Sequence, residues 1–293
     1  MEKHRVFIER LIQHDGPHES DYPELDAFIQ HLHRAVSDGG ITPSELADIR
    51  SWFGSALSTS TMQGFALAKP HGYAGDFELI DRFYQSYVSP DPQLAAWDRY
   101  AQRHAGAQAV RNRKTYFRDL LLRHAHPDRP IAVLNLASGP GRDVFEFFSH
   151  HPHLPVTFDC IEQDANAIRY ATELCRPFLQ HIAFTAANAL RFRPSRRYDI
   201  IWSAGLFDYF GDATFVRLLS RLAPALAPGG ELVVGNFSEQ NPSRSYMEFF
   251  EWSLQHRSAA QLLQLAERAG FSSTQLTIGS EPQGVNLFLH VAG

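Results

Sequence analysis

The stretch IAVLNLASGPGR, residues 131–142, decides the fold of this chain. Its first six residues are mostly apolar, as in a strand that is buried on both faces of a parallel sheet. The glycines at 139 and 141 then allow the backbone to turn and to pass close to a ligand where a side chain would clash. Residues 143–149 follow with a helical pattern. A buried strand, a glycine-rich turn and a helix indicate the opening of a doubly wound α/β domain.

The chain after His126-Pro-Asp128 alternates between strand-like and helix-like stretches. This pattern indicates a parallel sheet with right-handed crossovers. Gly229-Gly230 is expected to form the turn before the fifth strand. The last two strands have only a turn between them, so we expect an antiparallel hairpin at the edge of the sheet. The expected strands are 131–136, 156–161, 181–186, 198–203, 230–236, 272–278 and 284–291.

Before residue 127, apolar residues recur at helical spacing and strand-like runs are absent. Thr42-Pro-Ser-Glu45 predicts a helix start, with a capping threonine, a proline at the first position and a glutamate three residues after the cap. This helix should bury Ile49, Trp52 and Phe53. We therefore predict two domains, a helical one at 1–127 and an α/β one at 128–293. The other helices are expected at 6–13, 25–36, around 83–84, at 94–100 and at 107–124.

The composition is that of a globular protein. Apolar residues make up 44% of the 293 residues and charged residues 20%, which excludes a disordered chain. The formal net charge of −5 argues against a nucleic-acid partner, because phosphate binding usually leaves a basic excess. Cys160 and Cys175 lack metal-type spacing, so we interpret both as packing residues and expect no metal site.

The sequence also predicts a cytoplasmic protein. The opening MEKHR is followed by no long apolar run, so we expect no signal peptide. No stretch of about 18 apolar residues occurs, so no transmembrane helix is expected. A reducing cytoplasm fits the two unpaired cysteines. The choice between a monomer and a homodimer stays open.

A carboxylate follows the second expected strand. Glu162 lies about 20 residues beyond the glycines, where an acid in a doubly wound fold accepts hydrogen bonds from both ribose hydroxyls. Phe145 and Glu146 stand where a dinucleotide fingerprint would have its third glycine, which disfavours a nicotinamide dehydrogenase. No Gly-Lys-Ser/Thr follows the turn. The pattern therefore favours a mononucleoside ligand without phosphates.

Five segments, in this order, resemble the motifs of class I S-adenosylmethionine-dependent methyltransferases. The resemblance covers roughly residues 130–293. It implies a Rossmann-like α/β fold with a seven-stranded sheet whose last strand is antiparallel. It also implies S-adenosyl-L-methionine as cofactor and S-adenosyl-L-homocysteine as product. The segments are VLNLASGPGR (133–142), IEQD (161–164), ANAL (187–190), YDIIWS (198–203) and LAPGGELVV (226–234).

The same resemblance implies which residues contact the cofactor. Asn188 corresponds to the polar residue that holds the adenine amino group. Two positions depart from the family pattern, since Asn135 stands where an acid is usual and Ala137 replaces the first glycine. The implied contacts are Asn135, Ala137, Gly139, Gly141, Glu162, Gln163, Asn188, Ala189, Ser203 and Ala204.

The string KPHGYAGD, residues 69–76, contains two glycines, a proline, an aromatic residue, an acid and a base. Such a composition predicts a structured loop rather than a helix. One interpretation is a tight interhelical turn without a ligand. The other is a lid in which Tyr73 and Asp76 cover the sulfonium end of the cofactor or the acceptor, because an aromatic face or a carboxylate suits a cation.

Four segments resemble a narrower bacterial group, the methyltransferases of 3-hydroxypalmitic acid methyl ester, an extracellular quorum signal. This resemblance implies that the helices within 1–127 form a lid and substrate segment of the active site. It also implies a carboxyl acceptor, either a fatty acid or a natural-product acid. The segments are KPHGYAGD (69–76), AVRNR (109–113), GLFDY (205–209) and GVNLF (284–288).

Basic and aromatic residues supply further candidates. Arg111 or Arg113 is expected to pair with the carboxylate of the cofactor's methionine part, since a guanidinium fork fits it. The alternative is a solvated helix face. The aromatic residues of 249–254 either line an apolar acceptor pocket or, as we favour, form ordinary helix core.

The acceptor side is predicted after the fourth strand, at the carboxyl edge of the sheet. Asp208 and Tyr209 lie there, although packing is an alternative for Tyr209. With Tyr73 and His71 they form the predicted catalytic set.

We expect a small-molecule acceptor without membrane insertion. A carboxylate acceptor needs no general base, because it is ionised at neutral pH. A phenol, alcohol or amine would need one, and His71, Asp76, Asp208 or His256 could serve. The fold also hosts two other functions, chemistry on S-adenosylmethionine itself (cyclisation or aminocarboxypropyl transfer) and non-catalytic regulation.

Overall fold

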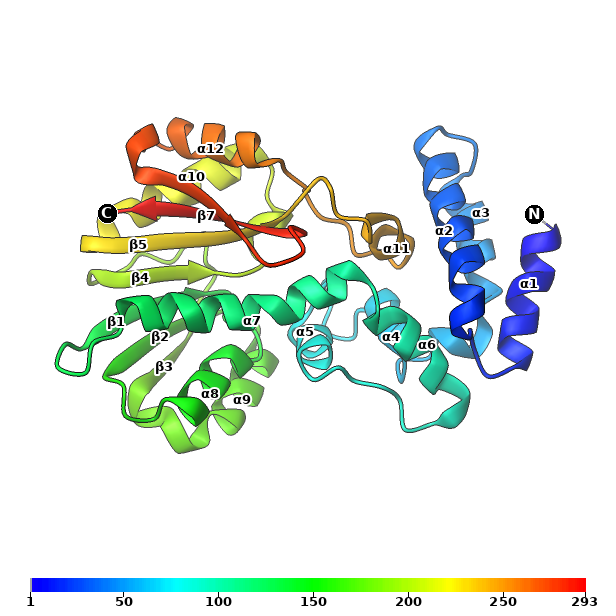
Figure 1. Ribbon diagram of the computed structural model, residues 1–293, viewed down its shortest axis with the longest axis horizontal. Coiled ribbons are helices and arrows are strands. Elements are labelled where there is room, and N and C mark those ends of the chain that lie inside the picture. Colours follow the sequence, from blue (N-terminus) through cyan, green and yellow to red (C-terminus); the bar gives the residue numbers. More distant parts are fainter. Residues whose placement is uncertain (1) are drawn as a thin grey trace. The chain divides into compact units, whose positions relative to one another are not determined.

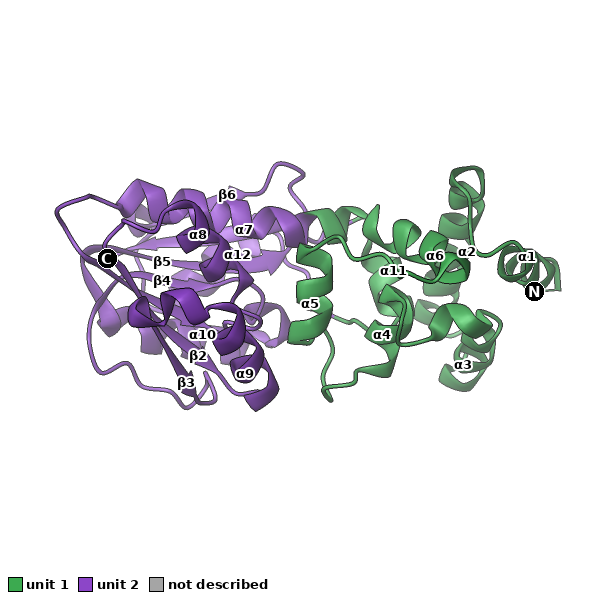
Figure 2. Cartoon of the chain, turned by 90° about the horizontal axis from the view of Figure 1, so that it is seen from below, with its two compact units in different colours: residues 1–108, 242–253 green, residues 109–241, 254–293 purple. Residues whose placement is uncertain are grey.

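The computed structural model describes residues 2–293 and divides them into two compact units, which Figure 2 colours separately. Among the described residues, unit 1 comprises 2–108 and 242–253, and unit 2 comprises 109–241 and 254–293. These units follow spatial contacts, whereas the domains 1–127 and 128–293 follow the sequence pattern and stay a prediction. No helix among residues 2–293 is long and apolar enough to cross a bilayer.

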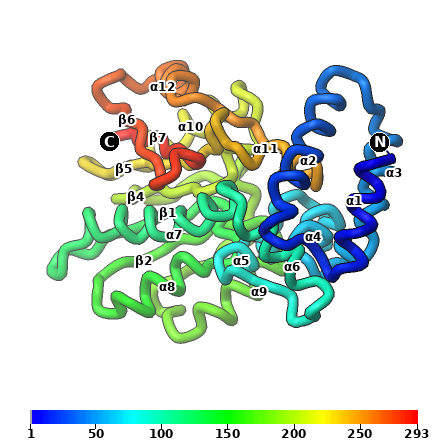
Figure 3. Tube along the Cα trace, turned by 45° about the vertical axis from the view of Figure 1, so that its right-hand side comes forward, coloured from blue at the N-terminus to red at the C-terminus, as the bar shows by residue number. Residues whose placement is uncertain are grey.

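Unit 1 is helical. Its core joins aromatic residues that are far apart in sequence, since the ring centroids of Phe53 and Phe249 are 5.5 Å apart. The segment 242–253 contributes α11, which packs on α2 (Figure 3). The helices are α1 (Glu2–Gln13), α2 (Tyr22–Ser37), α3 (Pro43–Ser51), α4 (Met62–Ala68), α5 (Phe77–Tyr84), α6 (Pro92–Gln102) and α11 (Arg244–Phe249).

The predicted helix start at residue 42 is confirmed. The Thr42 hydroxyl accepts a hydrogen bond from the Glu45 backbone N–H, and the Glu45 carboxylate accepts one from the Thr42 N–H at 2.8 Å. Ile49 is buried in α3, but the helix ends at Ser51, so Trp52 and Phe53 lie beyond it. Phe53 is nevertheless buried, whereas Trp52 is only partly so.

Unit 2 is built on one seven-stranded sheet with the order β3-β2-β1-β4-β5-β7-β6 (Figure 1). β7 is antiparallel to both β5 and β6, which confirms the predicted hairpin and the fold class. The strands are β1 (Ile131–Leu136), β2 (Val156–Glu162), β3 (Ile182–Ala186), β4 (Tyr198–Ser203), β5 (Leu226–Phe237), β6 (Leu276–Ser280) and β7 (Asn286–Ala292).

Helices cover both faces of this sheet. Alternate residues of β1 point to opposite faces, so Val133 packs in a core with α7 and α8, while Leu134 packs in a core with α10 and α12. Both faces are therefore apolar, as the sequence predicted. The helices are α7 (Ala105–His124, in unit 2 from residue 109), α8 (Arg142–His150), α9 (Ala165–Leu174), α10 (Asp212–Leu222) and α12 (Ala259–Arg268).

The largest differences from the expected strand boundaries are at the starts of β5 and β6. β5 begins at Leu226, and Gly229 and Gly230 form an irregularity inside it rather than a turn before it. Gly229 has a φ of +73°, and the register with β4 shifts there. β6 begins only at Leu276, because residues 273–275 form a short 3₁₀ turn. Both cysteines are free and buried, as expected of packing residues.

Candidate cofactor site

The turn between β1 and α8 has an unusual backbone. Ala137, Gly139 and Gly141 all have positive φ, at +53°, +55° and +67°, a region that favours glycine. A Cβ on Gly139 would meet no atom within 4 Å. A Cβ on Gly141 would lie 3.0 Å from the Cβ of Ala171 on α9. Gly139 thus leaves open space that a ligand can fill, whereas Gly141 allows α9 to pack closely.

Glu162 ties the end of β2 to this turn. One of its carboxylate oxygens, Oε2, accepts a hydrogen bond from the Gly139 N–H at 3.0 Å. The other, Oε1, accepts from the N–H groups of Gln163 and Asp164 at 2.7 and 3.0 Å. The side chain is held in place at the carboxyl edge of the sheet, where nucleosides bind in this class of fold.

Two further predicted residues meet beyond β2 and β3. The Asn188 amide donates to the Gln163 side-chain oxygen at 2.9 Å, and its own oxygen accepts from the Leu190 N–H. Both side chains are exposed. Ala189 is partly buried against the apolar core under β4 and β5. An exposed pair of amides offers donors and acceptors of the kind that an adenine edge requires.

Two buried polar atoms beside the turn lack a partner. The Asn135 amide nitrogen and the Ser138 hydroxyl have no hydrogen bond among the described residues, although the side chains are only 2% and 7% exposed. Leaving such groups unpaired costs about 1–3 kcal/mol each. A bound polar ligand would relieve that cost. The turn therefore fits a nucleoside cofactor, with open space at Gly139 and unpaired groups next to it.

Arg113 approaches the end of β4. Its guanidinium is buried and donates to the Ala204 carbonyl at 3.3 Å, while its Nε has no partner among residues 2–293. A Cβ on Gly205 would come within 2.6 Å of this guanidinium, so a larger residue there would have to displace the Arg113 side chain. Ser203 donates its hydroxyl to the Leu136 carbonyl at 3.1 Å and thereby joins β4 to β1.

Asp208 and Tyr209 differ in accessibility. Asp208 is buried, and its Oδ1 accepts from the Phe237 N–H at 2.6 Å. Burial raises the pKa of Asp208 to about 7, against the lowering effects of that hydrogen bond and of the Arg113 and Arg257 charges. Tyr209 is 40% exposed. Asp208 thus joins the segment after β4 to the end of β5.

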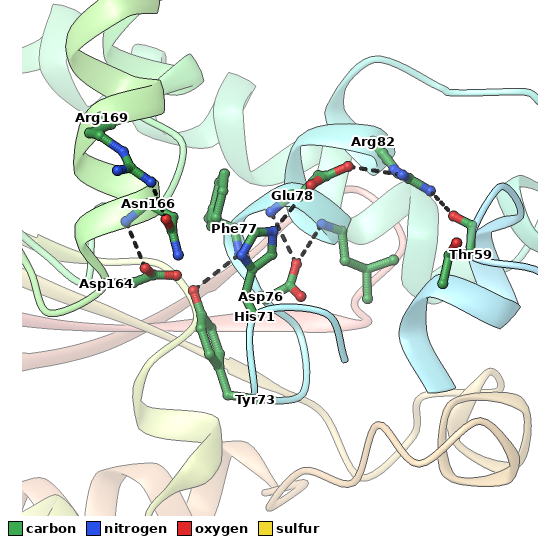
Figure 4. Close-up of polar contacts among 11 residues, drawn as sticks. Thr59, His71, Tyr73, Asp76, Phe77, Glu78, Arg82, Asp164, Asn166 and Arg169 are labelled. Atoms are coloured by element: carbon green, nitrogen blue, oxygen red, sulfur yellow. Dashed lines mark hydrogen bonds and ion pairs between the residues drawn. The ribbon is translucent and has the colours of Figure 1, made fainter. Parts of the chain in front are cut away.

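The loop 69–76 in unit 1 is ordered by its own side chains (Figure 4). Asp76 caps α5, because its Oδ1 accepts from the N–H groups of Glu78 and Leu79 at 3.1 and 2.9 Å. Burial raises the pKa of Asp76. The Tyr73 hydroxyl accepts from the Phe77 N–H at 3.3 Å. His71 lies 3.1 Å from a Glu78 carboxylate oxygen.

The predicted residues therefore fall into two groups. Unit 2 brings together the turn after β1, the ends of β2 and β4 and Arg113; unit 1 holds Tyr73, Asp76 and His71 in one loop. Sequence reasoning did not single out Ser138 or Arg257. Ser138 lay inside a quoted motif. Arg257 is buried, and its guanidinium donates to the carbonyls of Phe207 and Phe210 in the segment after β4. No local sequence pattern predicts these contacts.

The comparisons with known proteins agree with this geometry. Residues 133–230 match the family model described as a methyltransferase domain. No curated protein sequence matches the chain. The fold, the glycine turn and the family match define a class I S-adenosylmethionine-dependent methyltransferase, with S-adenosylmethionine as its cofactor.

Solved structures share the fold. A possible exported protein from Bordetella parapertussis is 20% identical over 93% of this chain and 95% of its own, with a TM-score of 0.67. A candidate O-methyltransferase from Nostoc punctiforme is 16% identical over 82% and 71%, with a TM-score of 0.54. The methyltransferase SibL is 14% identical over 82% and 70%, with a TM-score of 0.51. These likenesses define the fold, not the quorum-signal subgroup.

Proposed function

We propose that this enzyme transfers the methyl group of S-adenosylmethionine to a carboxylate oxygen of a small molecule, either a fatty acid or a natural-product acid, in signal or secondary-metabolite biosynthesis. The observation that carries the proposal is that three candidate bases already have local partners. Asp208 is buried and accepts a hydrogen bond from the Phe237 N–H, and Asp76 caps α5. His71 lies beside a carboxylate oxygen of Glu78. A carboxylate acceptor is ionised at neutral pH and needs no base.

The residues of unit 2 suit the cofactor as follows. Glu162 would accept from the ribose, the amides of Gln163 and Asn188 would meet the adenine, and Asn135 and Arg113 would bind the methionine part. S-adenosylmethionine supplies an activated methyl group on a cationic sulfur. The protein's own task is then to align the acceptor and to exclude water. The predicted lid residues, Tyr73 and Asp76, would contribute an aromatic face and a carboxylate.

An assay with radiolabelled S-adenosylmethionine and matched acceptors tests this proposal. The acceptors are octanoic acid, octanamide and octanol, together with benzoic acid, benzamide and phenol. We expect label in a methyl ester for at least one acid and none in its amide. The rate should vary little between about pH 6 and 8, because carboxylic acids are fully ionised there.

The same reactions distinguish rival chemistries by the nucleoside product. Methyl transfer releases S-adenosylhomocysteine, whereas cyclisation or aminocarboxypropyl transfer releases methylthioadenosine, and chromatography separates the two. Methylthioadenosine as the main product would contradict methyl transfer. Methylation of phenol or octanol with a rate that rises with pH, and of no acid, would contradict the carboxylate acceptor.

A further inference from the structure

Unit 1 contains a buried amide that has no hydrogen-bond partner. Gln63 on α4 is 2% exposed, and neither its Nε2 nor its Oε1 bonds to any other described residue. A buried amide that is left unpaired destabilises a fold. An apolar side chain of the same size would be the more stable choice at such a position, so the presence of glutamine needs an explanation.

Two other unpaired polar atoms line the same pocket. These are the His104 Nε2 and the Tyr246 hydroxyl, whose rings stack with centroids 4.0 Å apart. Gln63 lines this pocket with them. Apart from Ser243, its other walls are apolar, and they include two of the aromatic residues of 249–254, Phe250 and Trp252. Phe249 and Phe250 belong to the core of unit 1, and an acceptor pocket along this stretch stays a prediction.

The pocket adjoins a larger cleft of unit 1. His104, Ser243 and Tyr246 line both. The inner pocket has a volume of about 20 Å³ and the outer cleft about 260 Å³. The inner space holds little more than one group of the size of water. The outer cleft has room for a ring or a short chain.

The inner pocket is electrically neutral at neutral pH. Burial and the charge of Arg103 lower the pKa of His104 to about 3, and burial raises the pKa of Tyr246. In the outer cleft, Arg103 forms an ion pair with Asp26 at 2.6 Å. A charged group entering the inner pocket would find no opposite charge there. The site therefore discriminates against ions.

We propose that unit 1 contains a binding site for a small uncharged molecule that has an apolar body and one hydroxyl group. The hydroxyl enters the inner pocket and bonds to the Gln63 amide, which offers a donor and an acceptor, as a hydroxyl does. The apolar body occupies the outer cleft, where Ile29, Tyr100 and Pro242 offer apolar surface beside the Arg103–Asp26 ion pair. The proposal stands apart from the proposed methyl transfer, because every residue concerned belongs to unit 1 and the test measures binding.

Three probes of nearly the same shape test this site: benzyl alcohol, toluene and benzoate. Binding to the full-length protein is measured by saturation-transfer NMR titration. We expect benzyl alcohol to bind more tightly than toluene or benzoate. Gln63→Leu should weaken the binding of benzyl alcohol by about tenfold, the amount expected when one buried hydrogen bond is lost. The same substitution should leave the affinity for toluene unchanged. No binding of benzyl alcohol, or equal binding by the variant, overturns the proposal.

Thermal stability supplies an independent measurement. Gln63→Leu should keep or raise Tm, because it removes an unpaired buried amide. Gln102→Leu is the matched control, since the buried Gln102 amide donates to the carbonyls of Arg82 and Tyr87 at 3.3 and 3.2 Å. That control should lower Tm. A fall in Tm for Gln63→Leu as large as for the control would mean that the amide has a partner in the folded protein, and it would refute the site.

Discussion

The carboxylate of Glu162 accepts a hydrogen bond from the backbone N–H of Gly139, at 3.0 Å. One residue ends β2 and the other lies in the turn after β1, so the contact holds together two segments that are 23 residues apart. Glu162 accepts three backbone hydrogen bonds in all. A carboxylate has about four acceptor positions, so this side chain can both shape the turn and still accept from a ligand.

Glu162→Gln should weaken binding of S-adenosylhomocysteine by roughly tenfold or more, about 1.4 kcal/mol. The substitution replaces an acceptor oxygen by an N–H donor that faces backbone N–H groups. Calorimetric titration measures the effect. Glu173→Gln is the control, because Glu173 is exposed on α9 and pairs only with Arg176 among the contacts resolved here. Unchanged affinity in the Glu162 variant would contradict the proposal that Glu162 accepts hydrogen bonds from the ribose hydroxyls.

Alanine at the two glycines of the turn should have different effects. Gly139→Ala should lower cofactor affinity with a loss of stability of roughly 1–2 kcal/mol, the strain of a positive φ. Gly141→Ala adds a clash with Ala171 to the same strain and should lose more stability. Thermal unfolding measures the loss of stability in each variant, and calorimetric titration measures the loss of cofactor affinity. Equal stability losses would mean that the packing on α9 relaxes around the added methyl group.

Two substitutions test the predicted lid role of Asp76. Asparagine caps helices about as well as aspartate, whereas alanine costs about 1 kcal/mol. Asp76→Asn should therefore keep the Tm of the protein, and Asp76→Ala should lower it. If the Asp76 carboxylate lies near the sulfonium, Asp76→Asn should weaken the binding of S-adenosylmethionine more than that of S-adenosylhomocysteine, whose sulfur is uncharged. Equal effects on both ligands would leave Asp76 with its capping role alone.

Asp208→Asn should change how stability depends on pH. Burial raises the pKa of Asp208 from its ordinary 3.8 to about 7 in the folded protein. The protonated form is thus favoured by folding, and this stabilisation is full below about pH 4 and lost as the pH rises to about 7. The asparagine variant does not titrate. Its Tm relative to the wild type should therefore rise between these pH values, and a constant difference would contradict the raised pKa.

Features that depend on neighbours along the chain could be predicted from the sequence. The strand–turn–helix at 131–150, the cap at Thr42 and the final hairpin all follow from local spacing and turn chemistry. The α4 helix at 62–68 was missed, because it is short and has no strong periodic pattern. The start of β6 was misplaced because residues 273–275 form a short 3₁₀ turn instead of continuing the strand.

Features that depend on contacts between distant segments were decided only by the tertiary structure. Both glycines of the turn looked alike in sequence, yet only Gly141 packs against α9. The burial of Asp208, and its hydrogen bond to the Phe237 N–H at the end of β5, could not be predicted from the sequence. No sequence pattern predicted that the Gln63 amide is buried without a hydrogen-bond partner among the described residues. The sequence determined the class of fold and its cofactor turn, because these need only local geometry. Burial and hydrogen-bond partners required the folded chain, because residues remote in sequence supply them.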